Sequence, residues 1–238
     1  MRCSIAGLNV ELACGGRTKA QAEAYLASAC AQPAQITISV DAKAALQRRP
    51  ELQSEDLAEY LLTGDRFALA LLEHEGFMLH ASAVCWGGQA VCFSAPPGVG
   101  KSTHSEKWSR LFGAEILNDD KPALRRVNGR WMAYGTPWSG KHDLSRPAGA
   151  PLKAVCFLFR GERNEMEPLA PARALPLLLS QTLFQLWRER MELLLPLADD
   201  LLRHVSVWKL TCDQSDEGAE LARNTLFPDW ERREETDG

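Results

Sequence analysis

The amino-acid sequence predicts an α/β fold in which a mixed β-sheet is flanked by helices. Short apolar segments typical of strands recur along the chain, between longer segments of helical periodicity. A glycine-rich segment, residues 95–100, lies between one such strand and one such helix. Apolar residues make up 45% of the 238 residues, which is sufficient for a hydrophobic core in one domain or slightly more.

The first 75 residues are expected to form an N-terminal flanking α/β subdomain. Ser4 to Leu12 and Gln35 to Val40 have the composition of strands, and the alanine-rich segment Thr18 to Cys30 predicts a short helix. A longer helical pattern runs from Ser54 to Glu75, and Gly64-Asp65 is expected to divide it. This third of the chain contains no recognisable catalytic motif.

Residues 76–227 are expected to form a second domain, followed by a charged tail at 228–238. Two pairs, Gly87-Gly88 and Asn128-Gly129, predict the two-residue turns of β-hairpins. The strands expected here are Phe77 to Trp86, Ala90 to Ser94, Ala114 to Leu117, Pro122 to Val127, Arg130 to Tyr134, Leu152 to Phe159 and Val205 to Leu210. The helices expected here are Lys101 to Phe112, Ala174 to Arg203 with an interruption at Pro196, and Glu217 to Leu226.

Composition and charge argue against several classes of protein. The net charge of -4 argues against a nucleic-acid-binding protein that neutralises phosphates with a basic surface. No apolar run approaches the roughly 20 residues that cross a bilayer, and the first residues lack a long apolar signal segment, so a cytoplasmic protein is expected. The 7 cysteines are odd in number and include no Cys-x-x-Cys spacing, so neither a disulfide framework nor a structural metal is predicted.

The glycine-rich segment has the pattern of a phosphate-binding loop, or P-loop. Residues Pro97, Gly98, Val99, Gly100, Lys101, Ser102 and Thr103 contain the sequence Gly-x-Gly-Lys-Ser between a predicted strand and a predicted helix. Glycines let backbone N–H groups turn towards phosphate oxygens, and a helix N-terminus adds partial positive charge. Lys101 is expected to bind the β- and γ-phosphates of ATP, and Ser102 to ligate Mg2+. Ala95 stands where the usual pattern begins with glycine.

Two adjacent carboxylates follow the predicted strand Ala114 to Leu117. If that strand is parallel to the one before the loop, Asp119 and Asp120 lie at the same edge of the sheet as the phosphates. One carboxylate would then lie beside the metal, and the other would be free to act as a base. The alternative interpretation is that the triplet Asn118-Asp119-Asp120 forms a polar turn with no catalytic role.

Hairpin register gives His80 a place near the loop. A two-residue turn at Gly87-Gly88 pairs Trp86 with Gln89, and counting back along both strands places His80 opposite Ala95. His80 is therefore expected either near the reaction centre, where it would orient an aspartate or bind substrate, or as an ordinary edge residue.

Lys141 is a candidate for stabilising negative charge on a transferred phosphoryl group. It ends the glycine-bounded segment Gly135 to Lys141, which follows a predicted strand. Lys121, Arg160 and Arg163 are weaker candidates for the same role. A solvated surface cation is the alternative for each of them.

These residues together resemble a known family. His80-Ala81-Ser82-Ala83, the segment through Thr103, and Asn118-Asp119-Asp120-Lys121 are similar to the catalytic domain of HPr kinase/phosphorylase, and more closely to small HPr-kinase-like proteins found beside peptide-modification genes. That family shares its core with ATP-dependent phosphoenolpyruvate carboxykinases. The resemblance covers about Phe77 to Arg163, and it implies a P-loop set in a mixed sheet, unlike the fold of eukaryotic protein kinases.

The resemblance also implies roles for individual residues. Lys101 would bind the β- and γ-phosphates, and Ser102 would ligate Mg2+. Asp119 would match the general base and Asp120 a metal-side carboxylate, or the two would exchange these roles. His80 would match the family's active-site histidine. No segment here resembles the one that gives the bifunctional enzymes their phosphorylase activity.

The sequence therefore predicts an ATP- and Mg2+-dependent kinase that transfers the γ-phosphoryl group to a hydroxyl. The acceptor is expected to be a serine or threonine of a small protein or peptide, or a small molecule, and a homo-oligomer is possible. One alternative is a carboxykinase-like enzyme acting on an oxaloacetate-type acid. Another is a non-catalytic ATP-binding sensor or adaptor.

Overall fold

A small N-terminal sheet precedes the main sheet in the chain. The computed structural model describes residues 1–27, 33–182 and 190–229. Strands β1 (Arg2–Ile5) and β2 (Leu8–Leu12) pair antiparallel, and β3 (Ile36–Ile38) pairs parallel with β2. The prediction of one strand from Ser4 to Leu12 is wrong, because Ala6 and Gly7 adopt φ angles of 53° and 71° and form a tight turn.

Three helices accompany this small sheet: α1 (Gly16–Ala22), α2 (Ala42–Arg48) and α3 (Glu55–Leu71). The helix expected from Thr18 to Cys30 is shorter than predicted, since α1 gives way to a 3-10 turn at Glu23–Tyr25 and residues 28–32 lie outside the described ranges. The sequence-based reading missed α2, although Asp41 caps it by accepting a hydrogen bond from the Ala44 N–H.

Helix α3 is continuous, so the predicted break at Gly64-Asp65 is wrong. Gly64 is buried inside the helix, and a Cβ there would lie 3.0 Å from Cδ1 of Trp138. The glycine is therefore explained by close packing against Trp138 rather than by a break in the helix. After α3 comes a 3-10 turn, Leu72–His74.

The main sheet is mixed and, in the described part of the chain, has nine strands. The strands are β4 (Gly76–Met78), β5 (Ala81–Trp86), β6 (Gln89–Ser94), β7 (Glu115–Asn118), β8 (Ala123–Val127), β9 (Arg130–Tyr134), β10 (Gly149–Arg160), β11 (Glu165–Pro168) and β12 (Ser206–Cys212). Their main order is β4-β8-β9-β10-β6-β5-β7, and β12 also pairs with β10 and with β11. The long strand β10 thus has three partners: it is antiparallel to β9, and parallel to both β6 and β12.

Both predicted hairpins are present. Trp86 pairs with Gln89 and Ala81 with Ser94, which is the predicted register. The turn Asn128-Gly129 has positive φ at both residues, 50° and 77°, as a two-residue hairpin requires. The prediction of a single strand from Phe77 to Trp86 is wrong, however, because β4 pairs with β8 whereas β5 pairs with β6 and β7. His80 lies at the break between β4 and β5.

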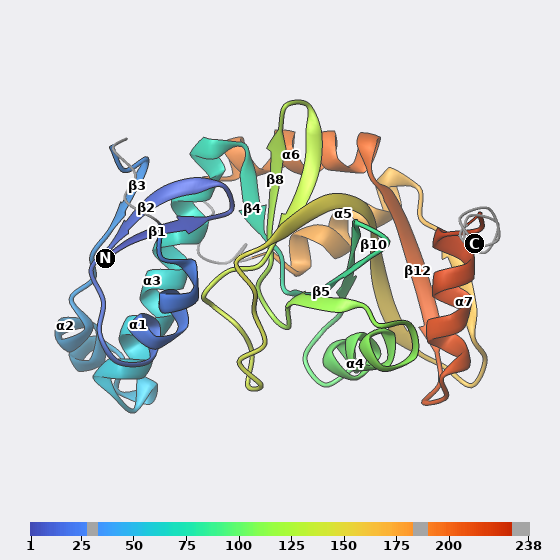
Figure 1. Cartoon of the computed structure of the whole chain (residues 1–238), viewed down its shortest axis with the longest axis horizontal. Helices are drawn as coiled ribbons and strands as arrows, with labels where there is room; N and C mark the ends of the chain where they lie inside the picture. The colour runs from blue at the N-terminus through green and yellow to red at the C-terminus, as the bar shows by residue number, and fades with distance from the viewer. Residues whose placement is uncertain (28–32, 183–189, 230–238) are drawn as a thin grey trace.

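Helices cover both faces of the main sheet: α4 (Lys101–Phe112), α5 (Pro171–Ser180), α6 (Met191–His204) and α7 (Glu217–Leu226). In the view of Figure 1 the N-terminal sheet and α1–α3 lie at the left, and α4 and α7 lie at the right. The predicted bounds of α4 and α7 are correct. The interruption predicted at Pro196 is wrong, since Pro196 lies within α6; the chain instead leaves the helix after Ser180, and residues 183–189 lie outside the described ranges.

Alternate residues of the central strands pack on opposite faces. In β6, Val91 and Phe93 join a cluster with Trp108 of α4, whereas Ala90 and Cys92 join the larger cluster on the other face. This alternation is the signature of a sheet buried on both sides. The predicted α/β architecture, a mixed sheet flanked by helices, is confirmed.

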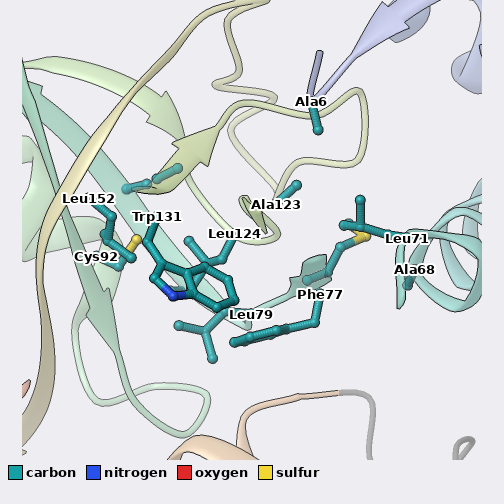
Figure 2. Packing of buried hydrophobic residues seen from close by; sticks show 14 of the residues in the cluster. Ala6, Ala68, Leu71, Phe77, Leu79, Cys92, Ala123, Leu124, Trp131 and Leu152 are labelled. Carbon is teal, nitrogen blue, oxygen red and sulfur yellow. The ribbon is translucent and has the colours of Figure 1, made fainter. Parts of the chain in front are cut away.

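The larger cluster also joins the N-terminal part to the main sheet. Leu71 of α3 and Phe77 of β4 both belong to it, and the ring of Phe77 meets that of Trp131 edge-on at 5.8 Å between centroids (Figure 2). The division into domains at residue 75 stays a prediction. Within the described ranges, no helix is both long and apolar enough to cross a membrane.

Candidate functional site

The glycine-rich loop, residues 95–100, connects the C-terminal end of β6 to α4, as predicted. Gly98 and Gly100 have φ angles of 81° and 124°, and a Cβ at either would meet no atom within 4 Å. Backbone conformation rather than lack of space therefore requires glycine at these two positions. Ala95 is buried and is not among the residues with positive φ, so an alanine is compatible with the first position of this loop.

The first turn of α4 lacks a side-chain cap. Gly100 is the N-cap residue, and no acidic residue lies in the first turn. Among the described residues, no side chain caps the N–H groups of that turn. The N-terminus of a 12-residue helix with its N–H groups unpaired by side chains favours an anion. Ser102 is half-buried and Thr103 exposed in this turn.

Lys101 lies with its side chain folded back over the loop. It is only 8% exposed, and its Nζ donates to the Ala95 carbonyl oxygen at 2.8 Å. Burial lowers the pKa of Lys101 from its ordinary value, while the charge of Asp120 acts in the opposite direction.

The strand topology brings the acidic pair to the same edge of the sheet as the loop. Strand β7 is antiparallel to β5, which is antiparallel to β6, so β6 and β7 run in the same direction. Their C-terminal ends are Ser94, just before the loop, and Asn118, just before the two aspartates. The two strands are therefore parallel, which is the condition under which the sequence places Asp119 and Asp120 at the edge of the sheet that carries the loop.

Asn118 holds the turn that carries both aspartates. Its Oδ1 accepts from the N–H groups of Asp120 and Lys121 at 2.8 and 2.6 Å. Its Nδ2 donates to the carbonyl oxygens of Thr136 and Trp138 at 3.0 and 3.2 Å. The fully buried Asn118 therefore connects the 118–121 turn to the 135–143 loop, a role that the polar triplet alone did not indicate.

The two aspartates have different surroundings. Asp119 is 4% exposed, and its Oδ1 accepts from the Gly140 N–H at 2.6 Å. Its Oδ2 is enclosed and has no hydrogen-bond partner among the described residues. Burial, together with the charge of Asp120, raises the pKa of Asp119 above its ordinary value, although the Gly140 N–H opposes this. A carboxylate enclosed in this way has no room for a reacting hydroxyl in this conformation.

Asp120 is more open, with 26% of its side chain exposed. Its Oδ1 lies 3.3 Å from Nε2 of His80, and its Oδ2 lies 3.8 Å from the Lys121 ammonium. Burial acts to raise the pKa of Asp120, but the hydrogen bond with His80 and the charges of Lys121 and Lys101 outweigh it and hold the pKa below its ordinary value. Asp120 is therefore ionised at neutral pH and lies beside His80 and Lys121.

His80 lies near the loop, although it is outside the β-ladder. Its carbonyl oxygen accepts from the Ser94 hydroxyl at 2.9 Å, and Ser94 immediately precedes the loop. On its other side, the backbone N–H of His80 donates to the carbonyl oxygen of Gln181, and Nδ1 faces Oε1 of the same residue at 3.0 Å. The sequence-based reading missed Gln181, because no motif connects two residues that lie 101 positions apart.

The other candidate cations differ in their placement. Lys141 is exposed at the tip of the 135–143 loop and has no hydrogen-bond or ion-pair partner within the described ranges. Arg160, at the end of β10, donates to the carbonyl oxygens of Val99 and Gly98 and so lies directly against the glycine-rich loop. Arg163 makes no such contact with the loop in the described part of the chain.

One cavity borders the glycine-rich loop, and a second borders His80 and Lys121. The larger, of about 500 Å³, is lined by Val99, Gly100, Thr103, His104, Lys107, Leu158, Arg160, Gly161, Cys212, Asp213 and Gln214. The smaller, of about 180 Å³, is lined by Met78, Leu79, His80, Lys121, Ser180, Gln181 and Thr182. The larger cavity is continuous with the first turn of α4, and the smaller one borders His80.

The N-terminal part supports the 135–143 loop. The Tyr60 hydroxyl contacts the backbone of Ser139, Trp138 stacks on Phe67 at 4.9 Å between ring centroids, and Arg17 donates to the Gly140 carbonyl oxygen at 3.3 Å. Because the Gly140 N–H binds Asp119, helices α1 and α3 are connected to the acidic pair through this loop.

Comparisons with known proteins do not identify the family of this chain. No protein-family model matches the chain, and no curated protein matches it. Among solved structures, the HPr(Ser) kinase/phosphatase from Coxiella burnetii is similar, with a TM-score of 0.37 and 13% sequence identity over 68% of this chain and 99% of that chain. So loose a likeness assigns no role to any residue of this chain.

Proposed function

We propose that this protein is an ATP- and Mg2+-dependent phosphotransferase that moves the γ-phosphoryl group to a hydroxyl. One observation carries the proposal: the glycine-rich loop, with the uncapped N-terminus of α4 and Lys101, lies at the same sheet edge as the Asp120–His80 pair. A phosphate-binding loop beside an ionised, accessible carboxylate is the combination that phosphoryl transfer to a hydroxyl needs.

The larger cavity supports a nucleotide as the donor. Its lining continues from Gly100 and Thr103 at the loop to Leu158 and Cys212 at the ends of two parallel strands. Phosphates bound at the α4 N-terminus would leave a nucleoside to extend into this space, whose size is that of ordinary ligand sites. Lys101 would then leave the Ala95 carbonyl oxygen and bind phosphate oxygens.

The donor set near the loop fits Mg2+. Within the described ranges no three His, Cys, Asp or Glu side chains gather into a metal site, but Mg2+ with a nucleotide needs few protein ligands, because phosphates and water complete its octahedron. The Ser102 hydroxyl, half-buried in the first turn of α4, would be one oxygen ligand. When bound, the ion would neutralise charge on the β- and γ-phosphates.

We assign the role of base to Asp120, which is the exchanged assignment left open by the sequence. The acceptor oxygen would attack the γ-phosphorus, the bond to the bridging oxygen would break, and ADP would leave with that oxygen. The hydroxyl proton would pass to the Asp120 carboxylate. Enclosure of the Asp119 carboxylate beneath Gly140 supports this choice, since Asp119 would first have to be uncovered to serve as base or metal ligand. The raised pKa of Asp119 has the same cause, burial. A raised pKa by itself makes a carboxylate a stronger base, so the choice of Asp120 rests on its access and not on its pKa.

The acceptor would bind on the side of His80. The smaller cavity has room for about one side chain, which supports a serine or threonine of a peptide or small protein, or a small hydroxylated molecule. Lys121 at its border would favour an acceptor with a negative group beside the hydroxyl.

Radiolabelled ATP tests this proposal with peptide pools and free serine as acceptors. We expect Asp120→Asn to lower the rate of transfer by about 100-fold or more while ATP binding persists, because only the proton acceptor is lost. Asp119→Asn should retain most of the transfer. Asp199→Asn, an exposed aspartate of α6 paired with Arg203, is the matched control.

The reverse result, with Asp119→Asn inactive and Asp120→Asn active, would support Asp119 as the base. Wild-type protein that binds ATP tightly but transfers phosphate to no acceptor would contradict the proposed activity and favour a nucleotide sensor.

A further inference from the structure

Arg160 lies beside the glycine-rich loop because β10 extends further than its neighbour β6. The last residue pair between these two parallel strands is Phe157 with Ser94, and β6 ends at Ser94. Strand β10 continues to Arg160, three residues further, which at about 3.3 Å per residue is roughly 10 Å past that pair. The backbone of Arg160 is fixed there by its pairing with Cys212 of β12.

The Arg160 guanidinium holds two consecutive carbonyl groups of the loop. Its Nε donates to the Val99 carbonyl oxygen at 3.3 Å, and its Nη2 donates to the Gly98 carbonyl oxygen. In a trans peptide the carbonyl of one residue and the N–H of the next point in opposite directions, and no peptide bond in the described ranges is cis. The N–H groups of Val99 and Gly100 are therefore turned away from Arg160. The Val99 N–H donates within the loop to the Pro96 carbonyl oxygen at 3.4 Å, and the Gly100 N–H lies next to the first turn of α4.

Without the guanidinium, these two peptides would be free to rotate. Gly98 and Gly100 flank them, with φ angles of 81° and 124°, and glycine changes backbone conformation at little cost in energy. A rotated peptide would put a carbonyl oxygen where the Gly100 N–H now lies. That oxygen carries partial negative charge and would repel a phosphate at the end of α4 that otherwise favours one.

We propose that Arg160 is a positioning residue that fixes the orientation of these two peptides, so that the loop presents N–H groups rather than carbonyl oxygens to phosphate. This inference rests on the proposed function only in that phosphates bind at this loop. Arginine suits the role because its N–H donors are held in a rigid planar fork, whereas a lysine ammonium is a point charge on a flexible stem. Arg160 thus acts through the backbone of the loop.

Nitrogen relaxation NMR tests the orientation of the loop without any nucleotide. In the wild type we expect the N–H groups of Val99 and Gly100 to have the order parameters of rigid backbone, about 0.85. In Arg160→Met and in Arg160→Lys they should fall below about 0.6 or show microsecond-to-millisecond exchange, because both variants lose the fork. Arg203→Met changes an exposed arginine that is paired within α6, and it should resemble the wild type. An equally ordered loop in Arg160→Met would overturn the inference.

Binding of polyphosphates is the second readout. Calorimetry compares ATP with inorganic tripolyphosphate, which has no nucleoside, each in the presence of Mg2+. Arg160→Met should raise both Kd values by about tenfold and by the same factor, because the loop and not the nucleoside contact is affected. Arg160→Lys should show most of the same loss, since charge alone does not hold both carbonyl groups.

Two binding results would overturn the inference. A wild-type Kd in Arg160→Lys would show that only the charge matters, and a loss confined to ATP would show that Arg160 acts on the nucleoside. Failure of the proposed function has a different signature. Wild-type protein that binds tripolyphosphate but transfers no phosphoryl group would contradict the proposed activity and leave the role of Arg160 intact. If the wild type binds neither polyphosphate, phosphate binding itself is contradicted, and the NMR result still decides whether Arg160 orients the loop.

Discussion

The Tyr60 hydroxyl forms two hydrogen bonds with the backbone of Ser139: it accepts from the N–H at 2.7 Å and donates to the carbonyl oxygen at 2.9 Å. Tyr60 belongs to α3, in the N-terminal third, and Ser139 immediately precedes Gly140, whose N–H binds Asp119. The helix therefore satisfies the polar backbone of a loop that contacts the acidic pair. The N-terminal third, which carries no catalytic motif, has a positioning role in this geometry.

Tyr60→Phe should destabilise the fold by about 1–3 kcal/mol, because it leaves a buried N–H and a buried carbonyl oxygen without their partner. Urea unfolding followed by fluorescence measures the change in the free energy of unfolding. Tyr134→Phe is the control, since the Tyr134 hydroxyl makes no hydrogen bond within the described ranges. Equal stabilities of the two variants would contradict a supporting role for Tyr60.

Gly64→Ala should also destabilise the protein, although alanine favours a helix interior by about 1 kcal/mol over glycine. The added Cβ would lie 3.0 Å from Trp138, which cannot withdraw because its ring stacks on Phe67 and its Nε1 donates to the Thr63 hydroxyl at 3.1 Å. Overpacking of this kind costs about 1–3 kcal/mol.

A double-mutant cycle separates the two effects of Gly64→Ala. In a Trp138→Leu background the clash is absent, so Gly64→Ala should become stabilising through helix propensity alone. If Gly64→Ala raises the urea midpoint in the wild-type background as well, close packing does not explain the glycine.

Local sequence patterns predicted those parts of the fold that depend on local chemistry. The turns at Gly87-Gly88 and Asn128-Gly129, the bounds of α4 and α7, and the glycine-rich loop after β6 all follow from residues adjacent in the chain. Hairpin register even brought His80 close to the loop. The same reasoning failed at Gly64, which close packing against Trp138 explains, and at Pro196, which lies inside α6 without ending it.

The remaining parts of the site depend on contacts between distant segments. Gln181 contacts His80 although they lie 101 positions apart, and Tyr60 contacts Ser139 although they lie 79 positions apart. A single sequence has no spacing pattern that predicts contacts between residues so far apart. The unequal burial of Asp119 and Asp120 was likewise not predictable, because it arises from the loop that lies over one of them. The sequence therefore placed the candidate residues at one edge of a sheet but left their individual roles open.

Lys101→Met should weaken ATP binding by about 10- to 100-fold, equivalent to about 1.4–2.8 kcal/mol, because the ammonium at the glycine-rich loop is lost. Isothermal titration calorimetry with ATP and Mg2+ measures the Kd. Lys43→Met in α2 is the matched control and should bind like the wild type. An unchanged Kd for Lys101→Met would contradict phosphate binding at this loop.

His104 predicts a specific dependence of stability on pH. Burial, with a smaller effect of the Lys107 charge, lowers the pKa of His104 from 6.5 to about 3, and its Nε2 accepts from the Trp108 Nε1–H at 3.3 Å. Between these two values the unfolded chain binds more protons than the folded protein. The stability from the neutral His104 is therefore complete above pH 6.5 and is lost as the pH falls towards 3, by at most about 1.4 kcal/mol per pH unit.

His104→Gln should remove this part of the acid sensitivity while keeping an acceptor for Trp108. Between pH 7 and pH 5 the wild type should lose up to about 2 kcal/mol more of its free energy of unfolding than His104→Gln does, as urea titrations at the two pH values will measure. His204→Gln, which changes a half-exposed histidine of α6, should retain the wild-type dependence. Parallel losses in the wild type and His104→Gln would show that His104 is already protonated in the fold or accessible to water. Such a result would contradict the claim that the His104 ring is buried and neutral in the folded protein.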